Sequence, residues 1–295
     1  MDPILSIITV VFNNEKYIGL AIENFLSQNC DSTEMLIIDG ASSDGTVEII
    51  KKYAVEHKNI RWISEQDSGQ SHAMNKSLKL AKGKYISFLN VDDYYSENTL
   101  KDILAIISVK DAPEFIVGNC NVWNPDGTLQ YINQPSQLKI WHLLSGYYLP
   151  VNPSAYFYKK EIHNRIGSYN EENHHNMDIE FLIEAASVTE MKYYPKIWGN
   201  FRLLPNTKTV NDQNSGTIEQ RKKELYQRYL QKSTYKVRAK TKCIIFQKKM
   251  QRAVFNVKKK IVLPFDKVYY KLKIIIRVFL SKVRVNTLFK DKLRK

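Results

Sequence analysis

The sequence predicts an α/β fold: a mostly parallel sheet flanked by helices, followed by a basic helical extension. Three observations support this prediction. Apolar segments alternate with segments of helical periodicity over the first 120 residues. The apolar segments lack a polar face, which is typical of strands covered by helices on both sides. Basic residues are concentrated towards the C-terminal end of the chain.

The strands expected in the first half are runs of β-branched and aromatic residues. They are Ile4–Val11, Glu34–Gly40, Ile60–Ser64, Lys84–Asn90 and Glu114–Asn119. Between them, apolar residues recur at intervals of three and four, as on the buried face of a helix. This spacing predicts helices at Glu15–Gln28, Thr46–Glu56, Ser68–Lys82 and Glu97–Ser108. Strands joined in this way by helices form a parallel sheet.

The regular alternation ends after Asn119. Residues 121–132 are expected to form a hairpin that turns at Pro125-Asp126-Gly127, since these residue types favour tight turns. The elements expected after the hairpin are short helices at Leu138–Leu144 and Glu161–Arg165, a longer helix at Asn176–Ala186, strands at Met191–Tyr194 and Trp198–Leu203, and basic helical structure from Thr217 onwards.

Charge separates the chain into a body and a basic tail. Residues 232–295 contain 21 Lys and Arg against two acids, a net charge of +19, whereas the remaining residues contain 23 against 28, a net charge of −5. The segment 205–217 is polar and turn-rich, which favours a boundary there. We therefore expect a domain of residues 1–215 and an extension of residues 216–295.

Several protein classes are disfavoured by missing patterns. The three cysteines, Cys30, Cys120 and Cys243, are scattered and are expected to be reduced thiols, as in a cytosolic protein. We expect no signal peptide and no membrane-spanning helix, because there is no basic leader and no run of 18 apolar residues. The absence of GxGxxG after the first strand argues against a dinucleotide-binding dehydrogenase, and the absence of GxxxxGK[ST] argues against a P-loop nucleotide hydrolase.

Polar and acidic residues follow four of the predicted strands, where open α/β sheets bind their ligands. These segments are Phe12-Asn13-Asn14, Asp39, Glu65–Gly69 and Asn90–Asp93. One interpretation is that each residue caps the next helix. Capping, however, does not require Asp92 beside Asp93, since adjacent carboxylates repel each other. A divalent cation with oxygen ligands would explain this pair and would also neutralise a diphosphate.

Four segments together resemble the family-2 glycosyltransferases, which have the Rossmann-like GT-A fold. They are SIITVVFNNEKYIGLAIENFLSQ, EMLIIDGASSDGTVEII, EQDSGQSHAMNKSLKLAKGKYISFLNVDD and NMDIEFLIEA, in the order typical of that family. The resemblance covers about residues 4–210. Its strongest part is similar to the family's D-x-G-Q-S-x-A-x-N-K segment, followed by a version of the DxD motif at Asn90-Val91-Asp92-Asp93.

The resemblance implies roles for individual residues of a nucleotide-sugar site. Val11, Phe12 and Asp39 correspond to the pocket for the nucleotide base, usually uracil; Asp67 to a residue that contacts base or ribose; and Asn75 and Lys76 to helix residues that approach the nucleotide-sugar. Asp92 corresponds to the carboxylate nearest the ribose and the metal, and Asp93 to the principal ligand of Mn²⁺ or Mg²⁺.

By the same resemblance, Asp178 corresponds to the catalytic base. Inverting sugar transfer is a single displacement, and the acceptor hydroxyl needs a base opposite the leaving group. Glu180 competes for this role, but residues two apart on a helix point about 200° apart, so only one of them can face the site. The motif favours Asp178.

The chain departs from the family pattern at three positions. Asn90 stands at the first DxD position, where a neutral side chain is expected to orient rather than ligate. Leu204 stands where the family often has the His of an Arg-x-His pair. If that His helps to hold the metal or the diphosphate, this function is weaker here or is provided by another residue. Asn152 stands where a His is common, which bears on the acceptor side.

The basic tail has three interpretations: a solvated helical face, a nucleic-acid site, or a helix on a membrane surface. Phosphate contacts need Lys and Arg, but no nucleic-acid-reading motif accompanies them here. Between Lys267 and Phe289, apolar residues recur at helical spacing among basic ones. We favour attachment to an anionic membrane surface and expect no nucleic-acid partner.

Together these features predict an inverting, metal-dependent hexosyltransferase. It would move a sugar from a nucleoside diphosphate, most simply UDP, to a saccharide or lipid-linked acceptor in cell-surface polysaccharide biosynthesis. We expect it in the cytoplasm, peripheral on the cytoplasmic face of the membrane. The alternative is a non-catalytic sugar-nucleotide or membrane-binding protein on the same scaffold.

Overall fold

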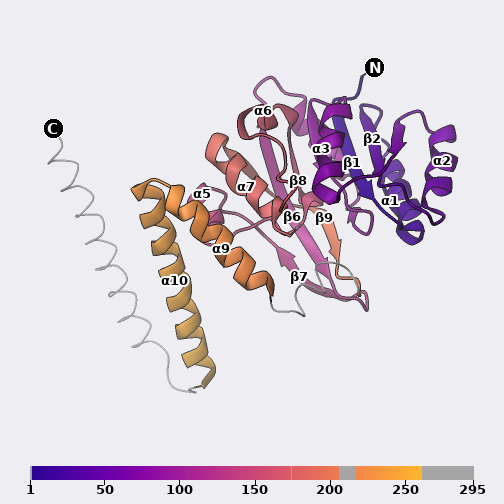
Figure 1. The fold of residues 1–295 in the computed structure, drawn as a ribbon. Helices are drawn as coiled ribbons and strands as arrows, with labels where there is room; N and C mark the ends of the chain where they lie inside the picture. Colours follow the sequence, from indigo (N-terminus) through magenta and orange to yellow (C-terminus); the bar gives the residue numbers. More distant parts are fainter. Residues whose placement is uncertain (1, 174, 206–216, 261–295) are drawn as a thin grey trace. The chain divides into compact units, whose positions relative to one another are not determined.

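The computed structural model describes residues 2–173, 175–205 and 217–260. Residues 1–244 form one compact unit, and a second unit begins at Ile245. Figure 1 shows the strands and helices of the first unit in their order along the chain. The proposed boundary after residue 215 remains a prediction.

The predicted alternation of strands and helices is confirmed in the first half of the chain. The strands are β1 (Leu5–Val11), β2 (Thr33–Asp39), β3 (Ile60–Ser64), β4 (Tyr85–Phe88) and β6 (Phe115–Trp123). The helices are α1 (Glu15–Ser27), α2 (Thr46–Glu56), α3 (Gln70–Leu80) and α4 (Thr99–Ile107). Helix α3 begins two residues later than expected, after Gly69, whose φ of 127° is incompatible with a helix.

Nine strands form one sheet within the described residues, with β7 beside β6 and the others in the order β3-β2-β1-β4-β8-β6-β9-β5. The further strands are β5 (Tyr94–Tyr95), β7 (Leu129–Asn133), β8 (Tyr156–Lys159) and β9 (Met191–Arg202). Strands β3, β2, β1 and β4 are parallel, and β6 and β9 run in the same direction as these four. Only β8, β7 and β5 are reversed. The predicted mostly parallel sheet is therefore confirmed.

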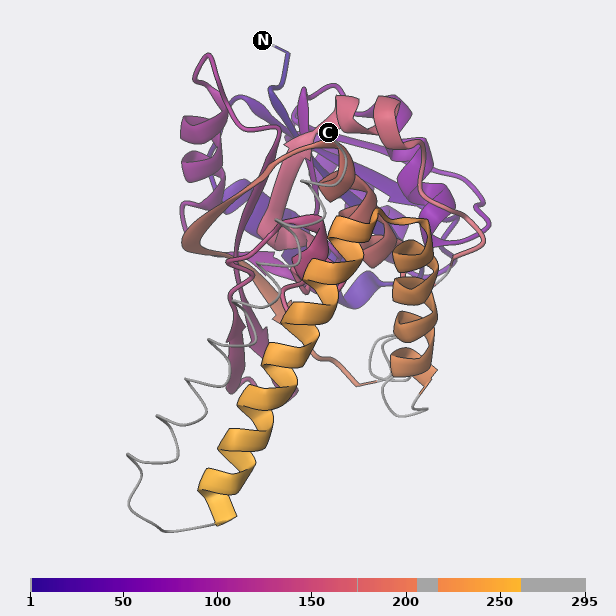
Figure 2. The same cartoon turned by 90° about the vertical axis from the view of Figure 1, so that its left-hand side faces the viewer.

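Helices cover both faces of the sheet, as Figures 1 and 2 show. Alternate residues of a strand point to opposite faces. Accordingly, Ile8 of β1 belongs to a buried cluster that includes residues of α3, whereas Ile7 belongs to a second cluster with α1, α2 and α4. The strands are apolar throughout because each one packs against helices on both sides.

The second half contains differences from the predicted elements. The hairpin is confirmed, since β6 and β7 pair and turn through residues 124–128. The two strands expected around residues 191–203 form the single strand β9. Its pairing with β6 shifts register near Pro195, because proline has no N–H to donate and a sheet accommodates it with an irregularity. Strands β5 and β8 were not predicted, being two and four residues long.

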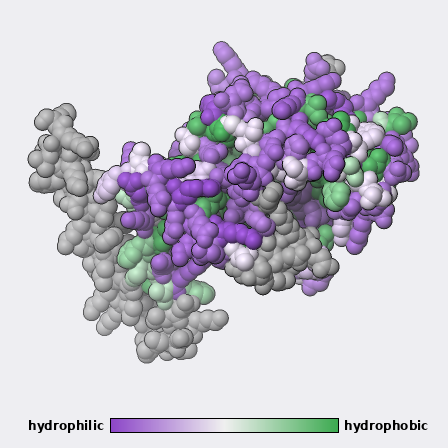
Figure 3. Space-filling model, viewed as in Figure 1, coloured by the Kyte–Doolittle hydropathy of each residue, from purple (hydrophilic) through white to green (hydrophobic). Residues whose placement is uncertain are grey.

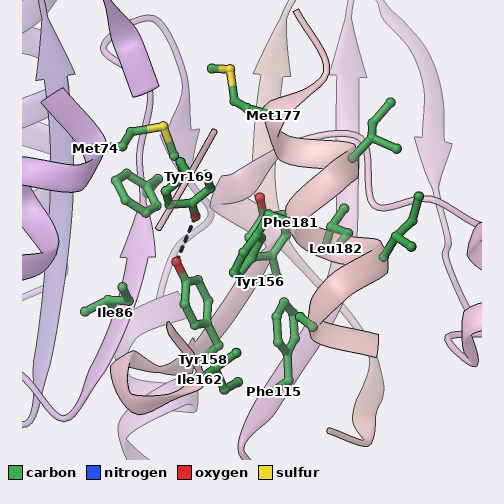
Figure 4. Packing of buried hydrophobic residues seen from close by; sticks show 14 of the residues in the cluster. Met74, Ile86, Phe115, Tyr156, Tyr158, Ile162, Tyr169, Met177, Phe181 and Leu182 are labelled. Atoms are coloured by element: carbon green, nitrogen blue, oxygen red, sulfur yellow. Dashed lines mark hydrogen bonds between the residues drawn. The ribbon is translucent and has the colours of Figure 1, made fainter. Parts of the chain in front are cut away.

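Between β7 and β9 the helices are short, apart from α7 (Met177–Val188). Helices α5 (Ile140–Leu143) and α6 (His163–Ile166) correspond to the two short helices expected here. Figure 4 shows how aromatic side chains hold α7 against the sheet. The ring of Phe181 lies 4.7 Å from that of Tyr158 and 5.2 Å from that of Tyr169, between centroids. The hydroxyls of Tyr158 and Tyr169 are joined by a 2.9 Å hydrogen bond.

Two basic helices follow: α9 (Thr217–Lys232) and α10 (Tyr235–Lys260). Helix α9 packs on α7, because the guanidinium of Arg228 donates a 2.6 Å hydrogen bond to Glu180 and the hydroxyl of Tyr229 donates to Glu184. Figure 3 shows a mainly hydrophilic surface over α9. The amphipathic segment expected between Lys267 and Phe289 lies outside the described residues. In the part of the chain that the structure describes, no helix is both long enough and apolar enough to cross a bilayer.

Candidate active site

The carboxyl ends of β1 and β2 are joined by hydrogen bonds between their loops. The N–H of Asn13 donates to Ser42 Oγ at 2.7 Å, and the N–H of Ser43 donates to the Asn13 side chain at 2.8 Å. The loop residue Asn13 and the neighbouring Ala41 both have positive φ, of 46° and 62°. The sequence thus builds two tight, interlocked loops at the sheet edge where ligands are expected.

Asp39 is completely buried at the end of β2 and holds this edge together. Its carboxylate accepts hydrogen bonds from the N–H and hydroxyl of Ser42 and from the hydroxyl of Ser64 at 2.6 Å. The residue therefore ties the loop after β2 to strand β3. Its assigned contact with the nucleotide base remains a prediction.

Phe12 and Asp67 meet over the backbone of Gly40. A Cβ atom added to Gly40 would lie 2.8 Å from Asp67 Oδ2 and 3.4 Å from a ring carbon of Phe12. The Phe12 side chain is 63% exposed, whereas the preceding Val11 is buried. An exposed aromatic ring beside a carboxylate can stack on a planar base and accept a hydrogen bond from it. The structure thus brings Val11, Phe12 and Asp67 to one edge.

Helix α3 contributes Lys76 and Asn75, which point to different partners. The ammonium of Lys76 donates to the backbone oxygen of Gln66 at 2.9 Å and lies 3.0 Å from Glu65, so it supports the loop that carries Asp67. The Asn75 amide donates to Tyr169 and Glu171 and accepts from the Tyr169 N–H. Asn75 therefore anchors the loop after α6.

Asp93 is a buried carboxylate with several hydrogen-bond donors. Its Oδ2 accepts from the amides of Asn90 at 2.9 Å and Asn152 at 2.7 Å, and its Oδ1 accepts from the N–H of Arg202 at 3.1 Å. Burial, together with the charge of Asp92, raises the pKa of Asp93 to about 7, although these hydrogen bonds act to lower it. Asn90, as expected, orients the motif.

Asp92 and Arg202 form the other half of this motif. Burial raises the pKa of Asp92, and the positive charge of Arg202 opposes that shift. The guanidinium Nε of Arg202 donates to the backbone oxygen of Asp92, and the group lies over the rings of Tyr17 and Tyr94, 5.2 and 5.7 Å from their centroids. Strand β9 thus places a cation, Arg202, beside the paired carboxylates.

A cavity of about 330 Å³ joins the end of β4 to the start of α7. Its lining includes Asn90, Asn152 and Asp178, which come from three distant parts of the sequence. The carboxylate of Asp178 contributes to the raised pKa of Tyr226, after the larger effect of burial, which places it near α9. Asp178 is therefore the carboxylate that faces the cavity.

Glu180 points to a different set of groups. It is 9% exposed and accepts hydrogen bonds from Arg228 at 2.6 Å, from Asn173 at 2.7 Å and from Tyr229 at 3.1 Å. Helical geometry separates it from Asp178, as expected for residues two apart. Glu180 therefore binds helix α9, through Arg228 and Tyr229, and the loop before α7, through Asn173.

The paired aspartates fit a divalent cation by their chemistry. Within the described ranges, no three His, Cys, Asp or Glu side chains are grouped as around a metal ion. Mg²⁺, however, is commonly held by one or two carboxylates, with substrate phosphates and water completing its shell. Burial raises the pKa of both Asp92 and Asp93, and the charge of Asp92 adds to the shift of Asp93, so a cation beside them would stabilise their charged forms.

The comparisons agree with this fold. The model of the family described as "Glycosyl transferase family 2" matches residues 6–169, which are more than half of the chain. The chain belongs to this family. A minor teichoic acid biosynthesis protein of Bacillus subtilis, GgaB, is 35% identical over 102 residues, which are 34% of this chain and 11% of that protein. The chain spans about half the length of the curated relatives it matches.

Two solved structures show the same GT-A fold. The S. aureus TarS 1–349 structure in complex with UDP-GlcNAc has a TM-score of 0.59 and 20% identity, and covers 71% of this chain and 61% of that one. The mannosyltransferase PcManGT of Pyrobaculum calidifontis, in complex with GDP-Man and Mn²⁺, has a TM-score of 0.52 and 17% identity, with coverage of 71% and 60%.

Sequence reasoning missed the contributions of Asn152, Gly40 and helix α9 to the site. Asn152 was noted only as a departure from the family, and its bond to Asp93 spans 59 positions. In α9, Arg221 and Lys222 line the cavity beside Ile218. One signal was present: the two cations occur at the helical spacing of the apolar residues Ile218 and Leu225.

Proposed function

We propose that this protein is an inverting hexosyltransferase that moves a sugar from a nucleoside diphosphate to an acceptor hydroxyl. The observation that carries the proposal is the shared cavity of Asn90 and Asp178. It connects the DxD-like motif, where a donor diphosphate would lie, to a carboxylate on another element. A displacement at the anomeric carbon needs both groups on opposite sides of the sugar.

Val11, Phe12, Asp39 and Asp67 form the nucleotide end of the proposed donor site, with Asn75 and Lys76 behind it. The exposed ring of Phe12 stacks on the base, and Asp67 accepts a hydrogen bond from base or ribose. We expect uracil, and the UDP-GlcNAc complex of TarS, which shares the fold, supports this choice.

Asp92 and Asp93 would hold Mn²⁺ or Mg²⁺, and Asp92 would also lie near the ribose. When bound, such a cation stabilises the negative charge of the leaving nucleoside diphosphate. The manganese complex of PcManGT supports the assignment. The chain's own contribution is the orientation of the motif: Asn90, Asn152 and the N–H of Arg202 fix the Asp93 carboxylate in one position.

Asp178 is the proposed general base. Its carboxylate accepts the proton of the acceptor hydroxyl as the acceptor oxygen bonds to the anomeric carbon and the bond to the diphosphate oxygen breaks. Glu180 is unsuitable for this role, because its oxygens accept hydrogen bonds from Arg228, Asn173 and Tyr229.

The proposed acceptor is a saccharide or a lipid-linked saccharide in cell-surface polysaccharide assembly, and the similarity to GgaB supports this class. A lipid-linked acceptor lies in a membrane, so the protein would act at a membrane surface, for which we propose the cytoplasmic face. Residues 235–260 contain ten Lys and Arg and no acid, and the exposed rings of Phe246 and Phe255 lie on α10. Such a helix suits an anionic lipid surface, and sedimentation with anionic rather than neutral vesicles tests it.

Transfer is tested by incubating the protein with a panel of UDP-sugars, Mn²⁺, and both saccharide and lipid-linked acceptors. We expect one donor to react, chelator to abolish the reaction, and the product to have the opposite anomeric configuration by NMR. Retention of configuration would contradict the proposed single displacement. If the protein binds UDP-sugars but transfers no sugar to any acceptor, the result would instead favour the alternative, a non-catalytic sugar-nucleotide-binding protein.

A further inference from the structure

Helix α9 presents two cations, Arg221 and Lys222, to the cavity that contains Asp178. Ile218 lines the same cavity, and Leu225 is 5% exposed. Residues three and four apart share one face of a helix. The two cations therefore lie on the packed face of α9, which is usually apolar in a helix that packs on a core.

The position of these cations is fixed by contacts further along the helix. Arg228 and Tyr229 hydrogen-bond to Glu180, and Tyr229 also donates to Glu184 of α7. Asp178 lies on α7 as well, two residues before Glu180. The cations and the proposed base are thus carried by two helices that are bonded to each other, which preorganises them for a common ligand.

The ligand of these cations is more consistent with the acceptor than with the donor. A general base must touch the acceptor hydroxyl, so the acceptor fills the part of the cavity next to Asp178. On the donor side, Asn90 lines the cavity, but Phe12, Asp67, Asp92 and Asp93 are not among its described lining residues. Among the described residues, the charged side chains in that lining are Asp178, Arg221 and Lys222. A guanidinium and an ammonium that line the same cavity suit an anionic ligand.

We propose that Arg221 and Lys222 form a subsite for a phosphate group of the acceptor. Arg and Lys together suit phosphate, since the guanidinium binds two oxygens and the ammonium binds a third. The proposal rests on the proposed function, with Asp178 as the base. The phosphate could belong to a lipid diphosphate or to a phosphodiester polymer, which share this chemistry.

Calorimetric titration tests the subsite without requiring turnover. The full chain is first saturated with UDP and Mn²⁺, and is then titrated with octyl diphosphate, glycerol 3-phosphate or octyl glucoside. The variants are Arg221→Ala, Lys222→Ala, the double variant and the charge-preserving Arg221→Lys. Lys223→Ala is the matched control, because Lys223 is exposed on the same helix and does not line the cavity.

We expect one or both phosphate probes to bind, and octyl glucoside to bind at least 10-fold more weakly. Each Ala variant in the subsite should lower the affinity for the phosphate probes about 10-fold. Arg221→Lys should lower this affinity by a smaller factor, and Lys223→Ala should change it by less than 2-fold. The stronger probe identifies the source of the phosphate. Absence of phosphate binding, equal binding of the neutral probe, or no effect of the variants would overturn the proposal.

Two controls separate this proposal from the proposed function. If the Ala variants weaken UDP binding as much as phosphate binding, the cations serve the donor and the acceptor subsite is wrong. If the phosphate probes bind as expected but no UDP-sugar reacts with any acceptor, the phosphate subsite is supported and the proposed glycosyl transfer is contradicted.

Discussion

The side-chain amide of Asn152 donates a 2.7 Å hydrogen bond to Oδ2 of Asp93, whose side chain is almost completely buried. The oxygen of the same amide accepts from the N–H and the hydroxyl of Ser154, at 2.9 and 2.6 Å, so the amide has one orientation. Asn152 stands where the family resemblance predicts a His. In this chain, the residue at this position therefore supports the DxD-like motif by a hydrogen bond to the carboxylate of Asp93.

Asn152→Ala is expected to lower the free energy of unfolding by about 1–3 kcal/mol, because a buried carboxylate loses a donor. It should also reduce sugar transfer, since Asp93 would be less well oriented. Urea unfolding and steady-state kinetics measure the two effects. The control is Asn164→Ala, an exposed position on α6 that should change stability by less than about 0.5 kcal/mol. Equal losses in both variants would refute the supporting role.

The bond between Asn152 and Asp93 illustrates what sequence patterns cannot predict. Strands β1 to β4 and helices α1 to α4 were predicted, because their apolar spacing is a local property of the sequence. The two-residue strand β5 has no measurable period, and β9 was split at Pro195 because the irregularity that accommodates a proline depends on the neighbouring strand.

The same limit applies to the site. Strand-end residues such as Asp39 and Asp92 were proposed from the sequence because the carboxyl edge of a parallel sheet is implied by the order of its elements, and their roles in the site remain predictions. The cations Arg221 and Lys222 were not found, since their contact with the cavity depends on how α9 packs against α7. Such packing is set by non-local contacts, of which the bond between Arg228 and Glu180 is one.

Asp178→Asn is expected to lower turnover by about 10²–10⁴-fold, the usual contribution of a general base. Donor binding should remain, because the residue faces the acceptor end of the cavity. Product formation and UDP titration measure the two quantities. A variant that keeps full turnover would exclude Asp178 as the base.

Glu180→Gln is the matched comparison, two residues along the same helix. It weakens the ion pair with Arg228 but keeps the side-chain shape. We expect unfolding free energy to fall by about 1–2 kcal/mol, less than for a fully buried pair, because Arg228 is 49% exposed. Turnover should fall far less than in Asp178→Asn. The opposite ranking would make Glu180 the base.

Glu34 gives stability a predictable dependence on pH. Its side chain is 3% exposed and accepts hydrogen bonds from Ser6 at 2.6 Å, Arg61 at 2.7 Å and the N–H of Lys82 at 2.7 Å. Burial alone would raise its pKa, but these hydrogen bonds and the charge of Arg61 outweigh that effect, so the pKa lies below its ordinary value of 4.5.

A lowered pKa means that the folded state releases this proton more readily than the unfolded state does. The resulting stability is fully present above the unfolded pKa and is lost as pH falls through the folded pKa. Urea unfolding at pH 3 to 7 should therefore show a steeper acid loss in the wild type than in Glu34→Gln, while Glu34→Gln is less stable at pH 7. Parallel curves would show that Glu34 contributes no such linkage.

Gly40 controls the approach of Phe12 and Asp67 at the proposed nucleotide pocket. A methyl group at this position would lie 2.8 Å from Asp67 Oδ2, too close for two unbonded atoms, and 3.4 Å from the Phe12 ring. The Asp67 side chain is able to move away, so the fold should tolerate Gly40→Ala. The movement removes a carboxylate from the pocket, and we expect UDP to bind about 10-fold more weakly.

Gly19→Ala is the matched control for this change. Its added methyl would lie 3.7 Å from Ile49, an ordinary contact, and its position within α1 favours alanine over glycine. We expect Gly19→Ala to raise the unfolding temperature slightly and to leave UDP binding unchanged, whereas Gly40→Ala should weaken UDP binding with little change in unfolding temperature. Calorimetric titration and thermal unfolding separate these effects. Normal UDP affinity in Gly40→Ala would show that the nucleotide base does not bind between Phe12 and Asp67.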